Sequence, residues 1–194
     1  MKGTAAPMVP KPIKPALVTV AEQSDAPHWI ETLRDGSEVL IRLLHKDDVD
    51  LEREFIRHLS PESRRMRFLG QVSEPGPDLL RNLTDFDALR AAAFVALVIS
   101  DGEFRQVGVS RYSTTKDGTS CECAVTVSDA WQKKGLGTLL MRRLIEHARA
   151  HGIRTMLSVD TAGNWRMQEL AHDLGFTRNP DPEDSTQVIY RLRL

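Results

Sequence analysis

Gln132-Lys133-Lys134-Gly135-Leu136-Gly137-Thr138 is the stretch that decides the fold, because of the segments on either side of it. Residues 119–127 precede it, and their β-branched and small apolar side chains are typical of a strand. The residues that follow predict an amphipathic helix, because apolar side chains recur at three- and four-residue spacing: Leu136, Leu139, Leu140, Leu144, Ile145 and Ala148. A strand therefore leads through a basic, glycine-containing loop directly into a helix.

The start of that helix is suited to a phosphate group. The first turn of a helix has unpaired N–H groups and the positive end of the helix dipole. Gly135 and Gly137 let a ligand approach the backbone without meeting a Cβ atom, and Lys133 and Lys134 add positive charge. The loop therefore predicts a phosphate or pyrophosphate site. The alternative is an ordinary turn whose glycines ease the start of the helix.

Two common phosphate-binding patterns do not fit this loop. It lacks the Walker sequence, and Leu140 stands where the dinucleotide fingerprint has its third glycine. The loop does match Gln/Arg-x-x-Gly-x-Gly/Ala, and in this it resembles the acyl-coenzyme A loop of the GNAT N-acetyltransferase superfamily. A second segment, from Asn164 through Met167 and Leu170 to Leu174-Gly175-Phe176, resembles the other signature of that superfamily.

The resemblance covers roughly residues 35–194 and implies an α/β domain of the GNAT fold. Its sheet is expected to be mixed and largely antiparallel, with about six to seven strands flanked by helices. Acetyl-CoA is the implied cosubstrate, and backbone groups around residues 125–127 are expected to pair with its pantetheine arm and to stabilise the oxyanion. The expected cofactor-binding residues are Val125, Val127, Gln132, Lys133, Lys134, Gly135, Leu136, Gly137, Thr138 and Asn164; for Asn164, a plain helix N-cap is the alternative.

Two further segments indicate the acceptor. Arg42 with residues 58–68, and Glu122-Cys123-Ala124-Val125 with residues 129–132, resemble the catalytic domain of bacterial protein-lysine acetyltransferases. That resemblance implies a primary amine as acceptor, with a protein lysine as the best guess. Two alternatives stay open: a GNAT enzyme for a small-molecule amine, and a coenzyme A-binding sensor domain without catalysis.

Glu122 is the candidate general base. On a strand it points to the face opposite Cys121 and Cys123, and because its neighbours are apolar or small we expect burial to raise its pKa towards the range of a working base. The resemblance places the most frequent base of the superfamily at this position. The alternative is a glutamate on a solvated strand face.

The sequence does not identify a general acid. Many relatives have a tyrosine four residues before the glycine of the Leu-Gly-Phe ending, and that position is Ala171 here; the adjacent His172 is expected on the surface. Arg64, Arg65 and Arg67 form a basic cluster, which either lies on a solvated helix face or helps to admit the acceptor.

The composition limits the remaining possibilities. The chain has 194 residues, a formal net charge of −1, 41% hydrophobic residues, and its longest apolar run, 91–99, is too short to cross a membrane. We therefore expect a cytoplasmic protein that binds neither nucleic acid nor membrane. Cys121 and Cys123 are too few for a structural zinc site, and no metal is expected. The oligomeric state, including a homodimer, stays open.

The proline distribution suggests one domain with an N-terminal arm. Five of the ten prolines lie in residues 1–27, which predicts a flexible arm before a single domain at 28–194. Strands are expected at 38–44, 91–100, 106–113, 119–127, 154–159, near 176 and at 187–192, and helices at 47–59, from 60 onward, at 79–83 and at 165–174. Asp-Gly turns at 101–102 and 117–118 predict an antiparallel meander of three strands.

Overall fold

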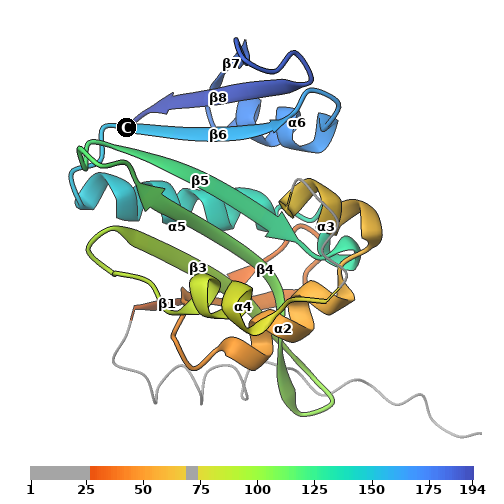
Figure 1. Cartoon of the computed structure of the whole chain (residues 1–194). Coiled ribbons are helices and arrows are strands. Elements are labelled where there is room, and N and C mark those ends of the chain that lie inside the picture. Colours follow the sequence, from red (N-terminus) through yellow and green to blue (C-terminus); the bar gives the residue numbers. More distant parts are fainter. Residues whose placement is uncertain (1–26, 69–73) are drawn as a thin grey trace, which may run out of the picture.

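A computed structural model describes residues 27–68 and 74–194 (Figure 1). The expected flexible arm therefore lies almost entirely outside the described residues. The described chain forms an eight-stranded sheet in the order β1-β2-β3-β4-β5-β6-β8-β7. The predicted α/β fold with a mixed, largely antiparallel sheet is confirmed, whereas the expected number of six to seven strands is wrong.

The helices and strands follow one another largely as the sequence pattern predicts. Their bounds are β1 His28–Thr32, β2 Glu38–Leu43, α2 Val49–His58, α3 Pro61–Phe68, α4 Pro77–Thr84, β3 Ala91–Ser100, β4 Glu103–Thr114, β5 Ser120–Val127, the 3₁₀ turn η1 Asp129–Trp131, α5 Leu136–Ala150, β6 Thr155–Thr161, α6 Trp165–Asp173, β7 Thr177–Pro180 and β8 Gln187–Arg193. The unpredicted strand is β1, an edge strand that pairs with β2. It is half-buried along most of its length, so its sequence has no alternation of apolar and polar residues.

The predicted meander of β3, β4 and β5 is confirmed. Both pairs are antiparallel, and each Asp-Gly turn places its glycine at positive φ, +82° for Gly102 and +70° for Gly118. Glycine adopts that backbone conformation without the strain that a Cβ atom brings. The turns therefore bring β5 into the centre of the sheet, where it becomes one side of the site.

The strands β5 and β6 form the one parallel pair among the described strands. They pair only from Ser120 to Glu122 on β5 and from Thr155 to Leu157 on β6, and beyond that point they diverge. On its other edge β6 pairs with β8 along its whole length, from Thr155 to Thr161 (Figure 1). Among the described strands, none pairs with the second half of β5 along the edge from which β6 diverges.

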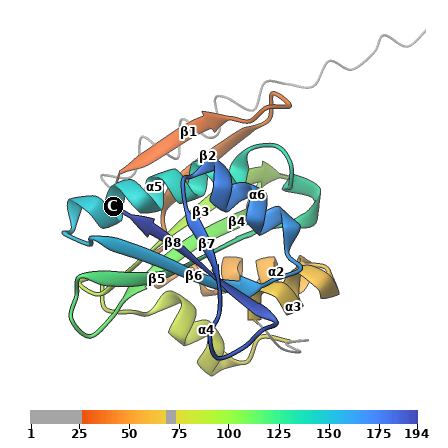
Figure 2. The ribbon, with the colours of Figure 1, turned by 90° about the horizontal axis from the view of Figure 1, so that it is seen from above.

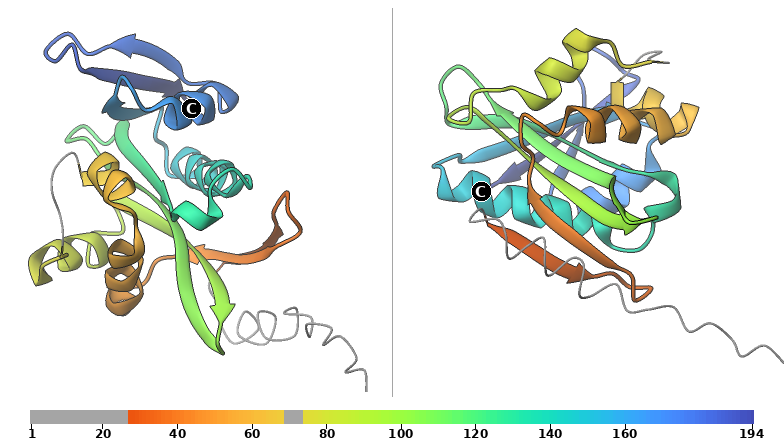
Figure 3. Two further views of the ribbon diagram at one scale, coloured as in Figure 1. Left: turned by 90° about the vertical axis from the view of Figure 1, so that its right-hand side faces the viewer. Right: turned by 90° about the horizontal axis from the view of Figure 1, so that it is seen from below.

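Helices cover the two faces of the sheet differently. α5 and α6 pack on one face over a core that includes Leu140, Met141 and Leu144 of α5, each 0% exposed. α2 and α4 pack on the other face, over a second core around Phe55 and Leu80 (Figure 3). Seen from above, the β1–β2 hairpin lies alongside α5 (Figure 2). None of the described helices combines the length and the apolar composition needed to cross a membrane.

The helix α3 is held at its N-terminus by the 3₁₀ turn η1. Ser60 caps α3 through a bond from the Ser63 N–H to its Oγ, and Pro61 is the first helical residue. The carboxylate of Asp129 accepts hydrogen bonds from the Ser60 N–H (2.9 Å), the Ser60 hydroxyl (2.8 Å) and the Ser63 hydroxyl (2.8 Å). This contact places α3 beside the open edge of β5.

Candidate active site

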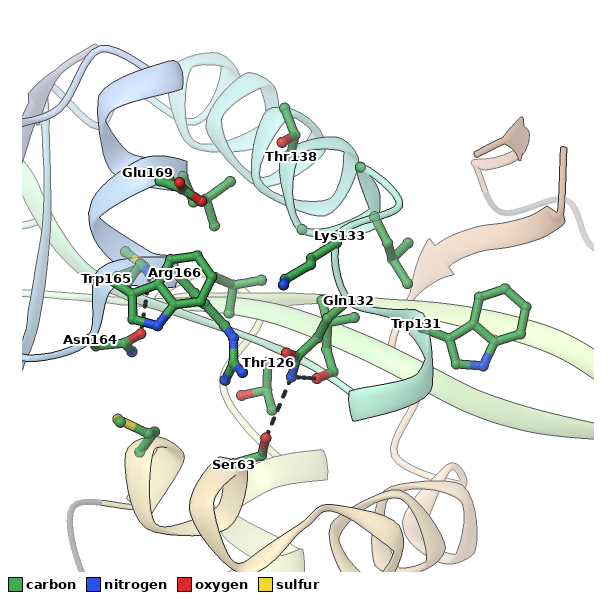
Figure 4. Close-up of a pocket in the computed structure, with 18 of the residues that line it drawn as sticks. Ser63, Thr126, Trp131, Gln132, Lys133, Thr138, Asn164, Trp165, Arg166 and Glu169 are labelled. Carbon is green, nitrogen blue, oxygen red and sulfur yellow. Dashed lines mark hydrogen bonds between the residues drawn. The ribbon is translucent and has the colours of Figure 1, made fainter. Parts of the chain in front are cut away.

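The loop after β5 and the first turn of α5 border a cavity of about 250 Å³ (Figure 4). Gly135 precedes α5 with a φ of +91°, and no side chain caps the helix there. The N–H groups of the first turn therefore stay available to an anionic ligand. A Cβ atom on Gly137 would stand 3.6 Å from Leu170 and 3.8 Å from Val127, in the gap between α6 and β5.

The open edge of β5 supplies the next part of the cavity. The Ser128 N–H donates to the Val107 carbonyl of β4, so alternate residues of β5 turn their backbone groups towards β4. Val125 and Val127 turn theirs the other way, to the side from which β6 has diverged. The Val127 carbonyl accepts a bond from the Gln132 side chain at 3.1 Å. Both valines line the cavity, as the predicted pairing with a pantetheine arm requires.

Gln132 connects the loop to two neighbouring elements. Its Nε2 atom bonds the end of β5 and also lies 3.4 Å from the Ser63 hydroxyl of α3. Burial alone would raise the pKa of Asp129, but the hydrogen bonds from Ser60 and Ser63 lower it overall. Asp129 therefore stays ionised and holds α3 and the loop in one arrangement.

The N-cap role considered for Asn164 is confirmed, whereas its contact with the cofactor stays a prediction. Its Oδ1 accepts from the Met167 N–H at 3.2 Å, which makes it the N-cap of α6, and it also lines the cavity. Its Nδ2 donates to Asp160 at 2.9 Å. Burial raises the pKa of Asp160, which the bonds from Thr161 and Asn164 partly offset. The cavity thus has a carboxyl group beside Asn164 that the sequence pattern did not reveal.

The two lysines of the loop do not share one role. Lys133 lines the cavity and lies 5.4 Å from the ring centre of Trp165, a side chain that is 49% exposed. Lys134 does not line it, because its ammonium group pairs with Asp35 at 2.9 Å. Arg34, from the turn between β1 and β2, lines the cavity instead. No local signal marks Arg34, because this turn is about a hundred residues from the loop in the chain.

Glu122 is the last residue of β5 that pairs with β6, so it stands where the two strands part. Cys121 and Cys123 are buried on the opposite face, as expected, whereas Glu122 is exposed. The expectation that Glu122 is buried is therefore wrong. Its sequence neighbours point away from it, so their apolar character says nothing about its surroundings.

Arg67 of the basic cluster lies nearby. Burial lowers the pKa of Arg67 to about 10, and the charge of Arg111 adds to this, while Glu52 and Glu122 raise it. Arg67 lines the cavity and is half-buried, whereas Arg65 is exposed. Part of the predicted cluster therefore faces the site and part faces solvent.

The helix position of the missing tyrosine holds no proton donor that faces the cavity. Ala171 is 1% exposed in α6, and the side chain of His172 is 89% exposed beside Asp173. Neither can protonate a leaving group inside the cavity.

The cavity fits acetyl-CoA. The start of α5 has no side-chain cap among the described residues, the open edge of β5 offers a backbone to pair with, and Lys133 and Arg34 supply positive charge. The buried Thr126 hydroxyl lines the cavity and has no hydrogen-bond partner among the described residues, so a ligand there can satisfy it.

Comparison with known proteins agrees with this geometry. Residues 55–176 match the acetyltransferase (GNAT) family. A Pseudomonas aeruginosa protein named acetyltransferase PA5475 is 52% identical over 167 residues, which are 86% of this chain and 90% of that protein. An L-methionine sulfoximine/L-methionine sulfone acetyltransferase of Pseudomonas paraeruginosa is 34% identical over 109 residues, or 54% of this chain and 63% of that protein.

Solved structures show the same fold. The GNAT domain of S. lividans PAT superimposes with a TM-score of 0.78 at 23% identity, covering 86% of this chain and 97% of that one. The Salmonella typhimurium protein yncA, solved with its cofactor acetyl-CoA, gives a TM-score of 0.58 at 22% identity, covering 80% and 94%. The chain therefore belongs to the acetyltransferase (GNAT) family and is an acetyl-CoA-dependent N-acetyltransferase.

Proposed function

We propose that Glu122 is the general base that deprotonates a primary amine for acetyl transfer. The observation that carries this proposal is the position of Glu122, exposed at the point where β5 and β6 part. There a carboxylate is open to an acceptor from solvent, and the open edge of β5 begins beside it. Acetyl-CoA supplies the acetyl thioester.

Each residue has a separate role in acetyl transfer. Glu122 accepts the proton of the ammonium group, so that the nitrogen lone pair can form a bond to the acetyl carbon while the carbon–sulfur bond breaks. The backbone N–H groups at Val125 and Val127 face the open edge and stabilise the oxyanion. The thiolate leaves with the bonding electrons and takes its proton from solvent, because neither Ala171 nor His172 can donate one inside the cavity.

We propose a protein lysine as the acceptor. The support comes from the resemblance of residues 58–68 to the protein-lysine acetyltransferases and from the exposure of Glu122. A lysine presented on another protein carries its amine at the end of a long side chain. Such an amine can reach a carboxylate at the surface without the rest of its protein entering the cavity.

A second candidate acceptor is a small amine that carries a carboxylate. Among the described residues, no carboxylate lies within ion-pair distance of Arg67, although it is half-buried and its charge interacts with that of Glu122. The acceptor's carboxylate would pair with this guanidinium while its amine meets the base. The relative named for L-methionine sulfoximine, an amino acid derivative, supports this candidate.

The base is tested with Glu122→Gln, with Glu103→Gln as a matched control at an exposed carboxylate of β4. We expect thiol release to fall by roughly 10²-fold in Glu122→Gln, with unchanged affinity for acetyl-CoA and a smaller loss at high pH. Glu103→Gln should behave like the parent. A rate that is unchanged across pH in Glu122→Gln would remove this residue from the mechanism.

The acceptor is tested with lysine peptides, free amino acids and their decarboxylated analogues. If a lysine is the acceptor, peptides should react faster than free amino acids, and Arg67→Gln should leave that rate nearly unchanged. If the acceptor carries a carboxylate, amino acids should react faster than their decarboxylated analogues, and Arg67→Gln should abolish that preference. If none of these acceptors causes thiol release, both candidates are contradicted.

A further inference from the structure

The turn between β1 and β2 is attached to the cofactor loop at two points. The Arg34 N–H donates to the Lys134 carbonyl at 3.1 Å, and the Lys134 ammonium lies 2.9 Å from Asp35. The hydrogen bond from Lys134, together with those from Ser37, lowers the pKa of Asp35 to about 2. The turn therefore has a defined place beside the loop, although it is an exposed hairpin end.

These contacts leave Arg34 and Lys134 in different situations. The charge of Lys134 is already matched, because its ammonium group touches Asp35 and lies 4.6 Å from the ring centre of Trp131. Arg34 lines the cavity, and among the described residues no carboxylate lies within ion-pair distance of its guanidinium group. Of these two cations, Arg34 is the one available to an anion in the cavity.

The position of the Arg34 side chain is the second observation. Its Nε atom would stand 3.5 Å from a Cβ atom built on Gly135, the residue that precedes α5. The guanidinium stem therefore lies over the start of α5, where no side chain caps the helix. Backbone N–H groups and a planar guanidinium then border the same space, and both are donors that suit phosphate oxygens.

We propose that Arg34 binds a phosphate group of acetyl-CoA, and that Asp35 holds the turn in position by engaging Lys134. The N-terminal hairpin thereby becomes part of the cofactor site. Because the inference concerns the cosubstrate alone, it goes beyond the proposed base and acceptor and stands whichever amine reacts.

The test measures the dissociation constant of acetyl-CoA by calorimetry for the parent chain, Arg34→Gln and Arg34→Lys. Since Arg34 is exposed, its pairing with phosphate is screened by solvent, and we expect Arg34→Gln to weaken binding roughly fivefold to tenfold. Arg34→Lys should recover part of the loss, because it keeps the charge but not the planar fork. The control is Arg142→Gln, which removes an exposed arginine of α5 outside the cavity and should not change the affinity.

Two further ligands, compared with acetyl-CoA, then identify the group that Arg34 contacts. With pantetheine, which has no phosphate, the parent and Arg34→Gln should bind equally. With 3′-dephospho-coenzyme A, equal binding would assign Arg34 to the 3′-phosphate, and a persistent loss would assign it to the pyrophosphate. The proposal is overturned if Arg34→Gln binds acetyl-CoA as tightly as the parent, or if it loses as much affinity for pantetheine as for acetyl-CoA.

Discussion

Replacing Gly137 by alanine should raise the stability of the free protein, whereas replacing it by valine should destroy the cofactor site. Gly137 is the second residue of α5 and does not have a positive φ. The new Cβ atom meets Leu170 at 3.6 Å and Val127 at 3.8 Å, which are ordinary contacts that displace nothing. Alanine loses less backbone entropy on folding than glycine, so the free energy of unfolding should rise by about 0.5 kcal/mol.

Valine at this position should oppose acetyl-CoA, because its two methyl groups extend beyond the Cβ atom beside Leu170 and Val127, which both line the cavity. Alanine should leave acetyl-CoA binding intact, since the loop pattern has glycine or alanine at this position. At a ligand concentration of about a hundred times the dissociation constant, acetyl-CoA stabilises the parent by about 2.7 kcal/mol. A hundredfold loss of affinity would reduce that stabilisation to about 0.4 kcal/mol. For a chain of this size the shift in Tm caused by the ligand should fall from about 5–10 °C to about 1 °C.

Thermal unfolding with and without acetyl-CoA measures both effects. Gly152→Ala is the control, because Gly152 has a φ of +78° with open space around its Cβ position and lies outside the cavity. It should lower Tm, because alanine is strained at that φ, and leave the ligand shift intact. Acetyl-CoA binding to Gly137→Val as tight as to the parent would refute the placement of the phosphate site at the start of α5. A Gly137→Ala protein that is less stable without ligand would refute the packing argument.

Three other changes test the elements around the site. Glu52→Ala removes the buried partner of Arg111, whose Nη2 atom lies 2.8 Å from it, and should lower the free energy of unfolding by about 3–5 kcal/mol in urea titrations. Asp129→Ala removes three hydrogen bonds to the start of α3. It should lower the free energy of unfolding by about 1–2 kcal/mol and weaken acetyl-CoA binding in calorimetry. If both values are unchanged, α3 does not depend on Asp129 for its position. Burial raises the pKa of Asp48, but the Arg42 guanidinium and the other hydrogen bonds lower it overall. The contribution of Asp48 to the free energy of unfolding is therefore present above about pH 4 and is lost as the pH falls through the lower pKa of the folded state. In a measurement of stability against pH, Asp48→Asn should flatten the acid side of the curve.

Local signals in the sequence were enough for most of the fold. The strand, loop and helix around Gly135 appear where the pattern predicts them, because each depends on side chains within one or two turns of each other. The Asp-Gly turn at Gly118 and the cap at Ser60 are similar, since both follow from backbone conformations that these residue types favour. The strand β1 was missed because a half-buried edge strand has no periodic pattern.

The exposure of Glu122 depends on which elements pack against its face of the sheet. Its sequence neighbours lie on the opposite face, so the sequence around Glu122 does not predict its exposure. Asp129 was identified only by its position in a matching segment, whereas its bonds to Ser60 and Ser63 join residues more than sixty positions apart. Such contacts form only when the chain brings distant segments together, and no local pattern encodes them.

The sequence by itself determined the family and predicted the place of the cofactor loop, because the glycines, the helix start and the strand before it are contiguous. Only the tertiary structure decided which charged side chains lie free beside that loop and which are already paired. Asp35 engages Lys134, and Arg34 reaches the cavity, because the hairpin of β1 and β2 folds beside α5. Whether a cation is free or already paired depends on which groups lie within a few ångströms of it, and that proximity is a property of the folded chain.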